Sequence, residues 1–319
     1  MRSPILITFM RIVVKHSAPL RLNSGLRVGA RLCGACALAL LCYGRAFAQE
    51  EQSPEEIAVS AERQTALDNE ALTISETPDA GPHSEHVSSI VGGGPMIAPA
   101  YIGAKKTKVT PFPYVDVRGL FGDRVFLSDV EGIGLKLLND GPVRAGFNVN
   151  YSSGRTSSDD PHLKGLPDIG GAAQAGAYLA FALRPFAIET KVEHRLGASS
   201  GTQVTFGAGV SAAPMPQFHL SVSAGVTWAD ARWQKTFFGV TPGQAAQSTL
   251  QGNLLTAYTP GSGLTEASVA FAGVYQVGTH WGLVARVALR DLVGTPVKDS
   301  PLTQRTFQPS YAFGAMYKF

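Results

Sequence analysis

From residue 87 onward, hydrophobic and polar residues alternate along the chain in blocks of about ten residues. In the block 218–228, apolar side chains occupy every even position, and His, Ser, Gly or Thr occupies every odd one. The blocks 143–151, 204–212 and 281–289 repeat this alternation. Successive side chains of a β-strand point to opposite faces, so a period of two predicts strands with one apolar face each.

Two architectures fit such strands, a soluble β-sandwich and a transmembrane β-barrel. The polar face of a sandwich meets water and is usually rich in charge, whereas here it is mostly Gly, Ser and Thr with a few Arg and Glu. Aromatic residues stand near strand ends, as they do in the interfacial girdles of barrels; these are Tyr151, Trp228, Trp281 and Phe319. Hydrocarbon cannot satisfy the backbone groups of an open sheet edge, so we predict a closed antiparallel transmembrane β-barrel of the all-β class.

The C-terminal segment carries the strongest evidence for a barrel. Aromatic residues alternate with other residues up to the last position, at Tyr311, Phe313, Tyr317 and Phe319. The last residues of a soluble domain are usually frayed and polar. An aromatic alternation that closes on Phe resembles the recognition signal of outer-membrane barrel proteins, and it implies the barrel-insertion machinery as a partner and outer-membrane lipid as the surroundings.

Connection lengths set the strand count, because bacterial barrels have short periplasmic turns, long external loops and an even number of strands. With the long connections 154–173, 229–263 and 292–306 outside, twelve strands are predicted. Their expected ranges are 88–96, 107–118, 123–129, 132–138, 143–153, 174–182, 187–196, 202–212, 216–228, 264–276, 279–291 and 307–319. The hairpin 123–138 is short for two spans of about 9–11 residues each, so the count becomes ten if it does not cross.

Two features interrupt the first strands. Pro111 and Pro113 each remove a backbone donor within the range 107–118, so we expect a bend or a bulge there. The run Gly92-Gly93-Gly94 lies in a strand pattern with no helix after it, so it does not predict a nucleotide site.

The N-terminal region has the pattern of an export signal. Residues 1–48 carry seven basic residues and no acidic one, and the apolar stretch 32–44 precedes Ala46-Phe47-Ala48. A basic region, a short apolar region and an A-x-A site form a secretory signal peptide, with Gln49 as the first residue after cleavage. All three cysteines of the chain lie in this segment, so the exported protein would contain no disulfide.

Charge divides the chain into three segments. Residues 1–48, 49–86 and 87–319 carry net charges of +7, −9 and +5, so removal of the first segment leaves −4. Segment 49–86 is acidic, polar and poor in apolar residues, which predicts a disordered periplasmic extension; residues 87–319 are expected to form the barrel. The basic excess of the whole chain therefore resides in a signal peptide and gives no support to nucleic-acid binding.

Charged residues at alternate strand positions are candidates for the lumen. They could form a constriction that selects solutes, or a salt-bridge ladder that fills a narrow barrel; the sequence leaves both open. The nine candidates are Asp116, Arg118, Arg144, Glu189, Lys191, Glu193, Arg195, Arg286 and Arg290.

Other candidate sites rest on short patterns. His219 and Ser221 lie two apart on one strand face, as a base and a nucleophile would, or as residues that fill the lumen. Asp159, Asp160 and His162 on a loop could bind a cation or be solvated. The patch 237–240 in a long loop either folds into the barrel mouth or contacts a partner. None of these patterns implies a cofactor.

Four groups of residues, in order and at matching spacing, resemble the MipA/OmpV family, the MltA-interacting proteins of Gram-negative outer membranes. The resemblance covers about residues 87–319. The groups are Pro111–Arg118, Phe126–Ser128 with Gly132–Leu138, Leu163–Ile169, and Thr227–Asp230 with Phe237–Pro242.

This resemblance implies an outer-membrane barrel without family-wide catalytic residues. One family member is a scaffold that links a lytic murein transglycosylase to a bifunctional murein synthase, and others are discussed as adhesins or permeability proteins. The first hypothesis is therefore a non-enzymatic scaffold for murein-remodelling enzymes. A narrow solute channel and a lipid-directed hydrolase are the alternatives.

Overall fold

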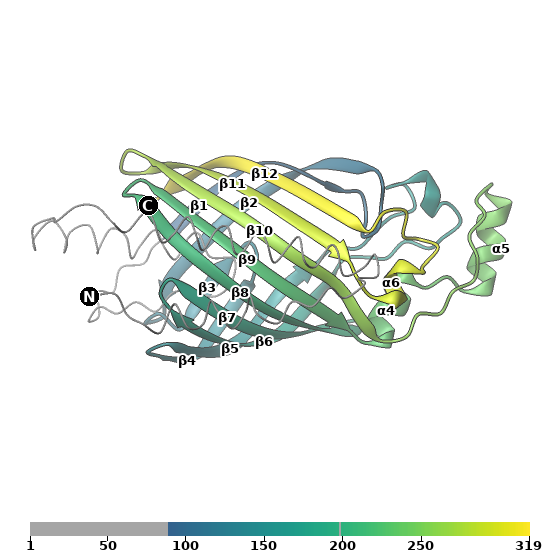
Figure 1. Ribbon diagram of the computed structural model, residues 1–319, viewed down its shortest axis with the longest axis horizontal. Coiled ribbons are helices and arrows are strands. Elements are labelled where there is room, and N and C mark those ends of the chain that lie inside the picture. The colour runs from purple at the N-terminus through teal and green to yellow at the C-terminus, as the bar shows by residue number, and fades with distance from the viewer. Residues whose placement is uncertain (1–88, 198) are drawn as a thin grey trace, which may run out of the picture. The chain divides into compact units, whose positions relative to one another are not determined.

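The computed structural model describes residues 89–197 and 199–319, and in this part of the chain twelve antiparallel strands form a closed barrel (Figure 1). Each strand pairs with its neighbours in sequence, and β1 closes the barrel against β12. The predicted twelve-stranded barrel is thus confirmed. The strands are β1 (Ser89–Pro99), β2 (Thr107–Leu120), β3 (Val125–Ser128), β4 (Gly132–Asp140), β5 (Val143–Ser152), β6 (Ala172–Leu183), β7 (Phe186–Arg195), β8 (Gly201–Met215), β9 (Phe218–Ala229), β10 (Gly263–Val277), β11 (Trp281–Leu292) and β12 (Phe307–Lys318).

The two ends of the barrel differ. Short turns and the C-terminus lie at one end, whereas the long connections and the helices α4 (Ala231–Phe238), α5 (Pro242–Leu250) and α6 (Thr295–Lys298) lie at the other (Figure 1). Bacterial barrels place short turns in the periplasm, so we call these the periplasmic end and the outer end. No helix among the described residues is long and apolar enough to cross a membrane.

The period of two in the sequence becomes an outer and an inner face. Large apolar side chains such as Phe147, Leu179, Phe206 and Leu283 are exposed on the wall, as contact with lipid requires. The inner positions next to Phe147 and Phe206 hold Gly, Asn or Thr. Packing explains the glycine run of β1, because a Cβ on Gly94 would lie 1.9 Å from the Phe313 carbonyl oxygen of β12.

The hairpin of β3 and β4 is shorter than the rest of the wall. Strand β3 has four residues and pairs with β2 only from Asp116 to Leu120. Strand β4 pairs with β5 only up to Val149. The hairpin therefore completes the twelve-stranded wall in its periplasmic part and ends below the outer end.

Of the bend or bulge expected at Pro111 and Pro113, the bulge is wrong for the pairing with β1. Strand β2 pairs with β1 in one unbroken register from Thr107 to Val117. Pro111 faces Pro95, and neither residue has an N–H group, so this pair is not hydrogen-bonded. Bonded and non-bonded pairs alternate along the ladder, so Pro113 also occupies a non-bonded position, and the ladder tolerates both prolines. The irregularity of β2 lies further along, between Val117 and Leu120 against β3.

Candidate functional site

The interior of the barrel contains a group of charged side chains, which begins with a row on β7. Glu189 is buried, and Lys191 and Glu193 are largely buried on the same face. The Lys191 ammonium lies 3.6 Å from the Glu193 carboxylate, which also accepts a 2.8 Å hydrogen bond from the Asn150 side chain. One carboxylate oxygen of Glu189 is buried without a hydrogen-bond partner among the described residues.

Arg286 of β11 reaches the tip of the short hairpin from four strands away. We call Asp129–Glu131, the turn between β3 and β4, the hairpin tip. The Arg286 guanidinium donates a 2.9 Å hydrogen bond to Asp129 and lies over the rings of Tyr114, at 4.8 Å, and Phe112, at 5.2 Å. The Asp129 carboxylate is 7% exposed, so this ion pair is largely shielded from water and screened little by salt.

A second arginine contacts the hairpin tip from β2. Arg118 donates to the Asp116 carboxylate, lies 3.9 Å from the Glu131 carboxylate and stacks over the Phe126 ring at 5.2 Å. The Asn148 side chain donates a 2.8 Å hydrogen bond to the Glu131 carbonyl oxygen. Arginines on two strands and an asparagine on a third therefore fix the hairpin tip inside the wall.

Towards the periplasmic end, Lys136 of β4 forms a 2.9 Å ion pair with Asp123. The Asp123 carboxylate also accepts hydrogen bonds from the Gly119 amide, at 3.2 Å, and the Asn139 side chain, at 3.3 Å. Arg144 of β5 is 2% exposed on the inner face. Charges of both signs thus occupy the lumen from the hairpin tip to the periplasmic turns.

Two of the predicted lumenal arginines lie apart from this group. Arg195, at the outer end of β7, is fully buried and donates to the carbonyl oxygens of Ser152 and Gly170. Its guanidinium lies 5.4 Å from the centre of the Phe237 ring, so it supports the outer loops. Arg290 is exposed near the outer end of β11.

The outer loops pack into a cap, which the sequence analysis did not predict. Four connections, 100–106, 153–171, 230–262 and 293–306, supply one hydrophobic core. A second core joins α4 and α6 to the outer ends of β9 and β11. We call these two cores and their loops the outer cap. Their residues are Ala100, Tyr101, Ala104, Leu163, Leu166, Val240, Leu255 and Leu302 in the first, and Ile169, Ala229, Trp233, Phe237, Phe238, Leu292 and Val297 in the second.

Local signals position the helices of the outer cap. Asp230 accepts a hydrogen bond from the Trp233 amide and so begins α4, and Thr241 with Gln244 forms a capping box at the start of α5. The Trp233 ring packs against the Phe237 ring, with centroids 4.6 Å apart and the planes tilted by 33°. The patch 237–240 therefore folds into the barrel mouth, one of the two alternatives that its sequence left open.

Polar groups of the outer cap link loops that are distant in sequence. The Tyr101 hydroxyl donates a 2.9 Å hydrogen bond to the Leu302 carbonyl oxygen, and Arg155 donates a 2.8 Å hydrogen bond to the Phe237 carbonyl oxygen. Burial raises the pKa of Tyr101, and the Asp160 carboxylate raises it further. The hydroxyl therefore stays protonated and remains a donor at physiological pH.

The residues considered for a cation bind protein groups instead. Asp159 accepts from Lys108 at 2.9 Å, Asp160 caps a short 3-10 helix, and His162 lies 2.9 Å from the Pro301 carbonyl oxygen. Within the described ranges, no group of three or more His, Cys, Asp or Glu residues is arranged to hold a metal.

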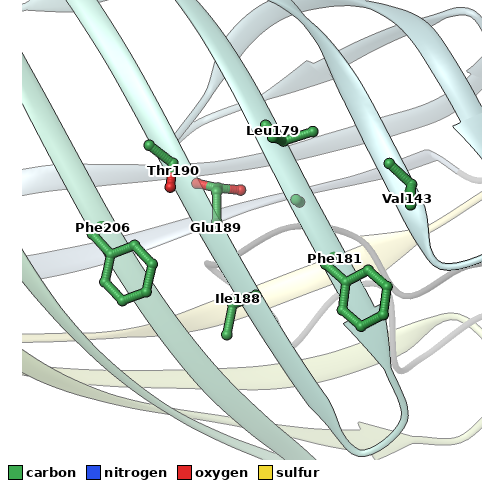
Figure 2. A pocket seen from close by; sticks show the side chains of 8 residues that line it. Val143, Leu179, Phe181, Ile188, Glu189, Thr190 and Phe206 are labelled. Atoms are coloured by element: carbon green, nitrogen blue, oxygen red, sulfur yellow. The ribbon is translucent and has the colours of Figure 1, made fainter.

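His219 and Ser221 are buried on the inner face of β9, at 0% and 5% exposure. The apolar outer face of the wall carries a hollow of about 250 Å³ between β5, β6, β7 and β8 (Figure 2). Phe181, Ile188 and Phe206 line this hollow together with the polar Glu189 and Thr190. The pair thus has no direct access to the hollow.

The C-terminal aromatic residues form a ladder on the wall at the periplasmic end. Tyr317 contacts Trp281 and Phe319 edge-on, with centroid distances of 5.1 Å and 5.0 Å. Tyr311 and Phe313 are exposed on the same face of β12. The expected cleavage site at Ala46, Ala48 and Gln49 and the acidic extension 49–86 lie outside the described residues.

Comparison with known proteins gives a family and distant structural likenesses. Residues 91–319 match the family model described as MltA-interacting protein MipA. No curated protein matches the chain. Among solved structures, the chain is similar to the NanC porin, with a TM-score of 0.36 and 10% identity over 73% of this chain and 100% of that one. OmpT of Vibrio cholerae gives 0.33 and 10% over 73% and 97%, and the outer-membrane channel DcaP of Acinetobacter baumannii gives 0.32 and 7% over 73% and 96%. Likenesses this distant carry no functional argument.

Proposed function

The chain belongs to the MipA family of MltA-interacting proteins, and from this premise we propose that it is a non-enzymatic scaffold that holds murein-remodelling enzymes at the outer membrane. The family match over residues 91–319 carries the proposal. The partners would be a lytic murein transglycosylase and a murein synthase. Partner contacts leave no sequence pattern of their own, so the family supplies the partner class and the barrel supplies the membrane anchor.

The termini complete this proposal. Residues 1–48 would direct export, with cleavage between Ala48 and Gln49. The acidic segment 49–86 would remain in the periplasm as a disordered tether. The barrel-insertion machinery would read Tyr311, Phe313, Tyr317 and Phe319. Crosslinking of intact envelopes followed by identification of the co-purified proteins tests the scaffold role, and recovery without any murein enzyme would contradict it.

The turn between β2 and β3 offers a contact point for a periplasmic partner. Phe121 is 83% exposed there and has a φ of 51°, while Asp123 has a φ of 61°. A left-handed conformation is strained for a bulky residue, and strain is often retained at functional positions. An exposed aromatic on a strained turn at the periplasmic end suits a protein contact.

Replacing Phe121 with alanine is expected to weaken transglycosylase binding about 30-fold, the usual cost of removing an aromatic anchor from an interface. Biolayer interferometry with the detergent-solubilised full chain measures the affinity. Leu254→Ala is the matched control, because Leu254 is 89% exposed but belongs to the outer loops. Equal affinities for both variants would remove the turn from the interface.

The alternative function is a narrow solute channel, favoured by the buried charges of β7. Ion pairs across the lumen and the outer cap argue for little conductance. In planar bilayers the wild-type chain is therefore expected to give no stable single-channel steps. Steps that change when Lys191 and Glu193 are replaced with glutamine would support the channel and contradict a pure scaffold.

A lipid-directed hydrolase is the third candidate. The burial of His219 and Ser221 on the inner face speaks against it. Lipase activity of the wild-type chain that disappears in Ser221→Ala would favour the hydrolase over the scaffold and the channel.

A further inference from the structure

The outer part of the barrel wall contains a seam. Strand β2 pairs with β3 from Asp116 to Leu120, and from Thr107 to Tyr114 no described strand pairs with its β3 side. On the far side of the short hairpin, Asn150–Ser152 of β5 extend beyond the last pair with β4. We call the interval between these two segments the seam. At the hairpin tip β2 and β5 are three inter-strand spacings apart, about 14 Å.

The two prolines of β2 match the demands of an unpaired edge in lipid. Pro95 of β1 stands opposite Pro111, and since neither has an N–H group this pair cannot be hydrogen-bonded. Hydrogen-bonded and non-bonded pairs alternate along an antiparallel ladder, so the pair of Gly93 with Pro113 is also non-bonded. The backbone groups of Pro111 and Pro113 therefore point away from β1, into the seam.

A hydrogen bond at the lower end of the seam supports this assignment. The Val115 carbonyl oxygen, two residues after Pro113, accepts a 2.9 Å hydrogen bond from the Asp129 amide on the β3 side. A free N–H group in hydrocarbon is costly, and proline removes that donor at two successive edge positions. Proline at an edge also hinders pairing with a foreign strand.

The surroundings of the seam are amphipathic. Val109, Ile133 and Tyr151 are 68%, 61% and 75% exposed, among the more exposed large apolar side chains of the wall. Directly above, the outer rim of β2 presents three exposed lysines, Lys105, Lys106 and Lys108. Lys108 forms a 2.9 Å ion pair across the top of the seam with Asp159 of the loop 153–171.

The seam also reaches an apolar part of the lumen. Tyr114 packs on the inner side of β2 with Ile90, Val274, Val284 and Met316, and Phe112 packs against this cluster. The outer cap covers the axial route to this region, because four loops share its core. An acyl chain that enters at the seam would therefore meet the apolar side chains of Phe112 and Tyr114.

We propose that the seam is a lateral port that binds a phosphorylated, acylated lipid of the outer leaflet. The seam is continuous with the lipid-facing wall, so the molecule next to it is already a lipid. An acyl chain enters between β2 and β5 towards Phe112, and the lipid phosphate binds the lysines at the rim. This function is additional to the scaffold role and does not depend on it.

Site-specific quenching tests the port. Cys33, Cys36 and Cys42 of the full chain are replaced with serine, and single cysteines labelled with bimane are introduced at Thr110, Ser223 or Phe206. Thr110 faces the lumen beside the seam, Ser223 faces it on β9 away from the seam, and Phe206 faces lipid. In vesicles of phosphatidylcholine with an acyl-nitroxide phospholipid, the label at position 110 is expected to be quenched nearly as strongly as the label at 206, and the label at 223 much less. Equal, weak quenching at 110 and 223 would overturn the port.

The headgroup contact has its own readout. Quenching at position 110 is expected at lower concentrations of acyl-nitroxide phosphatidic acid than of the matching phosphatidylcholine. Replacing Lys105, Lys106 and Lys108 with glutamine is expected to weaken this preference by about fivefold for each lysine. The absence of any preference would overturn the role of the lysines. Disulfide-linked dimers of Val109→Cys in vesicles would overturn the lipid assignment and make the seam a strand-pairing edge.

Discussion

Replacing Arg286 with methionine is expected to lower the free energy of unfolding by about 3–5 kcal/mol, because it leaves the buried Asp129 carboxylate without its cation. The loss includes the stacking of the guanidinium over Tyr114 and Phe112. Urea unfolding of the folded barrel in detergent, followed by tryptophan fluorescence, measures the change.

Two controls separate the ion pair from general damage to β11. Arg290→Met removes an exposed arginine from the same strand and is expected to change stability by no more than about 0.5 kcal/mol. The double variant Arg286→Met with Asp129→Asn is expected to recover much of the loss, since a buried pair removed together costs less than one orphaned charge. Equal destabilisation by Arg286→Met and Arg290→Met would show that Asp129 does not depend on this pair.

The ion pair of Arg286 with Asp129 helps to hold the short β3–β4 hairpin in the wall. Strand β3 has four residues, too few to hold a place in the wall by ladder hydrogen bonds alone. Arg286 and Arg118 supply the missing attachment through Asp129 and Glu131. The same contacts fix the lower end of the seam, so they link the stability of the wall to the proposed port.

The strands of the wall were predictable from the sequence because the alternation that defines each strand involves only neighbouring residues. Alternation assigns each strand residue to the lipid-facing or the lumenal face. Counting back from Phe319 then assigns the strands one by one. The resulting strand ranges agree with the observed ones to within three residues. The placement of Glu189 and Lys191 on the inner face follows from the same parity.

The remaining features depend on contacts between segments far apart in sequence. Asp129 and Glu131 look like ordinary turn residues, and only the approach of Arg286, 157 positions away, gives Asp129 a role. The sequence predicts a bend or a bulge at the prolines of β2, because it does not show that one edge of this strand lacks a partner. Aromatic residues at α-helical spacing, Trp233 with Phe237, were the available signal for the outer cap.

Replacing Phe238 with alanine is expected to destabilise the outer cap by about 3–5 kcal/mol, because Phe238 is fully buried between α4 and its neighbours. The barrel itself keeps its ladder, so the variant should still show the mobility of a folded barrel on unheated gels. Proteolysis of the loop 239–262 and faster amide exchange in α4 measure the loss of the cap. Leu250→Ala is the control, because Leu250 is 81% exposed in the same loop and packs little.

The same variant shows whether the outer cap blocks ion flow through the outer mouth of the barrel. If the shared core of the four loops blocks the axial route, Phe238→Ala should give single-channel steps where the wild-type chain gives none, and Leu250→Ala should resemble the wild type. The buried charges of β7 would then set the ion selectivity of the opened lumen. If the cap of Phe238→Ala is fully digested but the barrel still gives no single-channel steps, the lumen itself blocks ion flow, at the ion pairs around the hairpin tip.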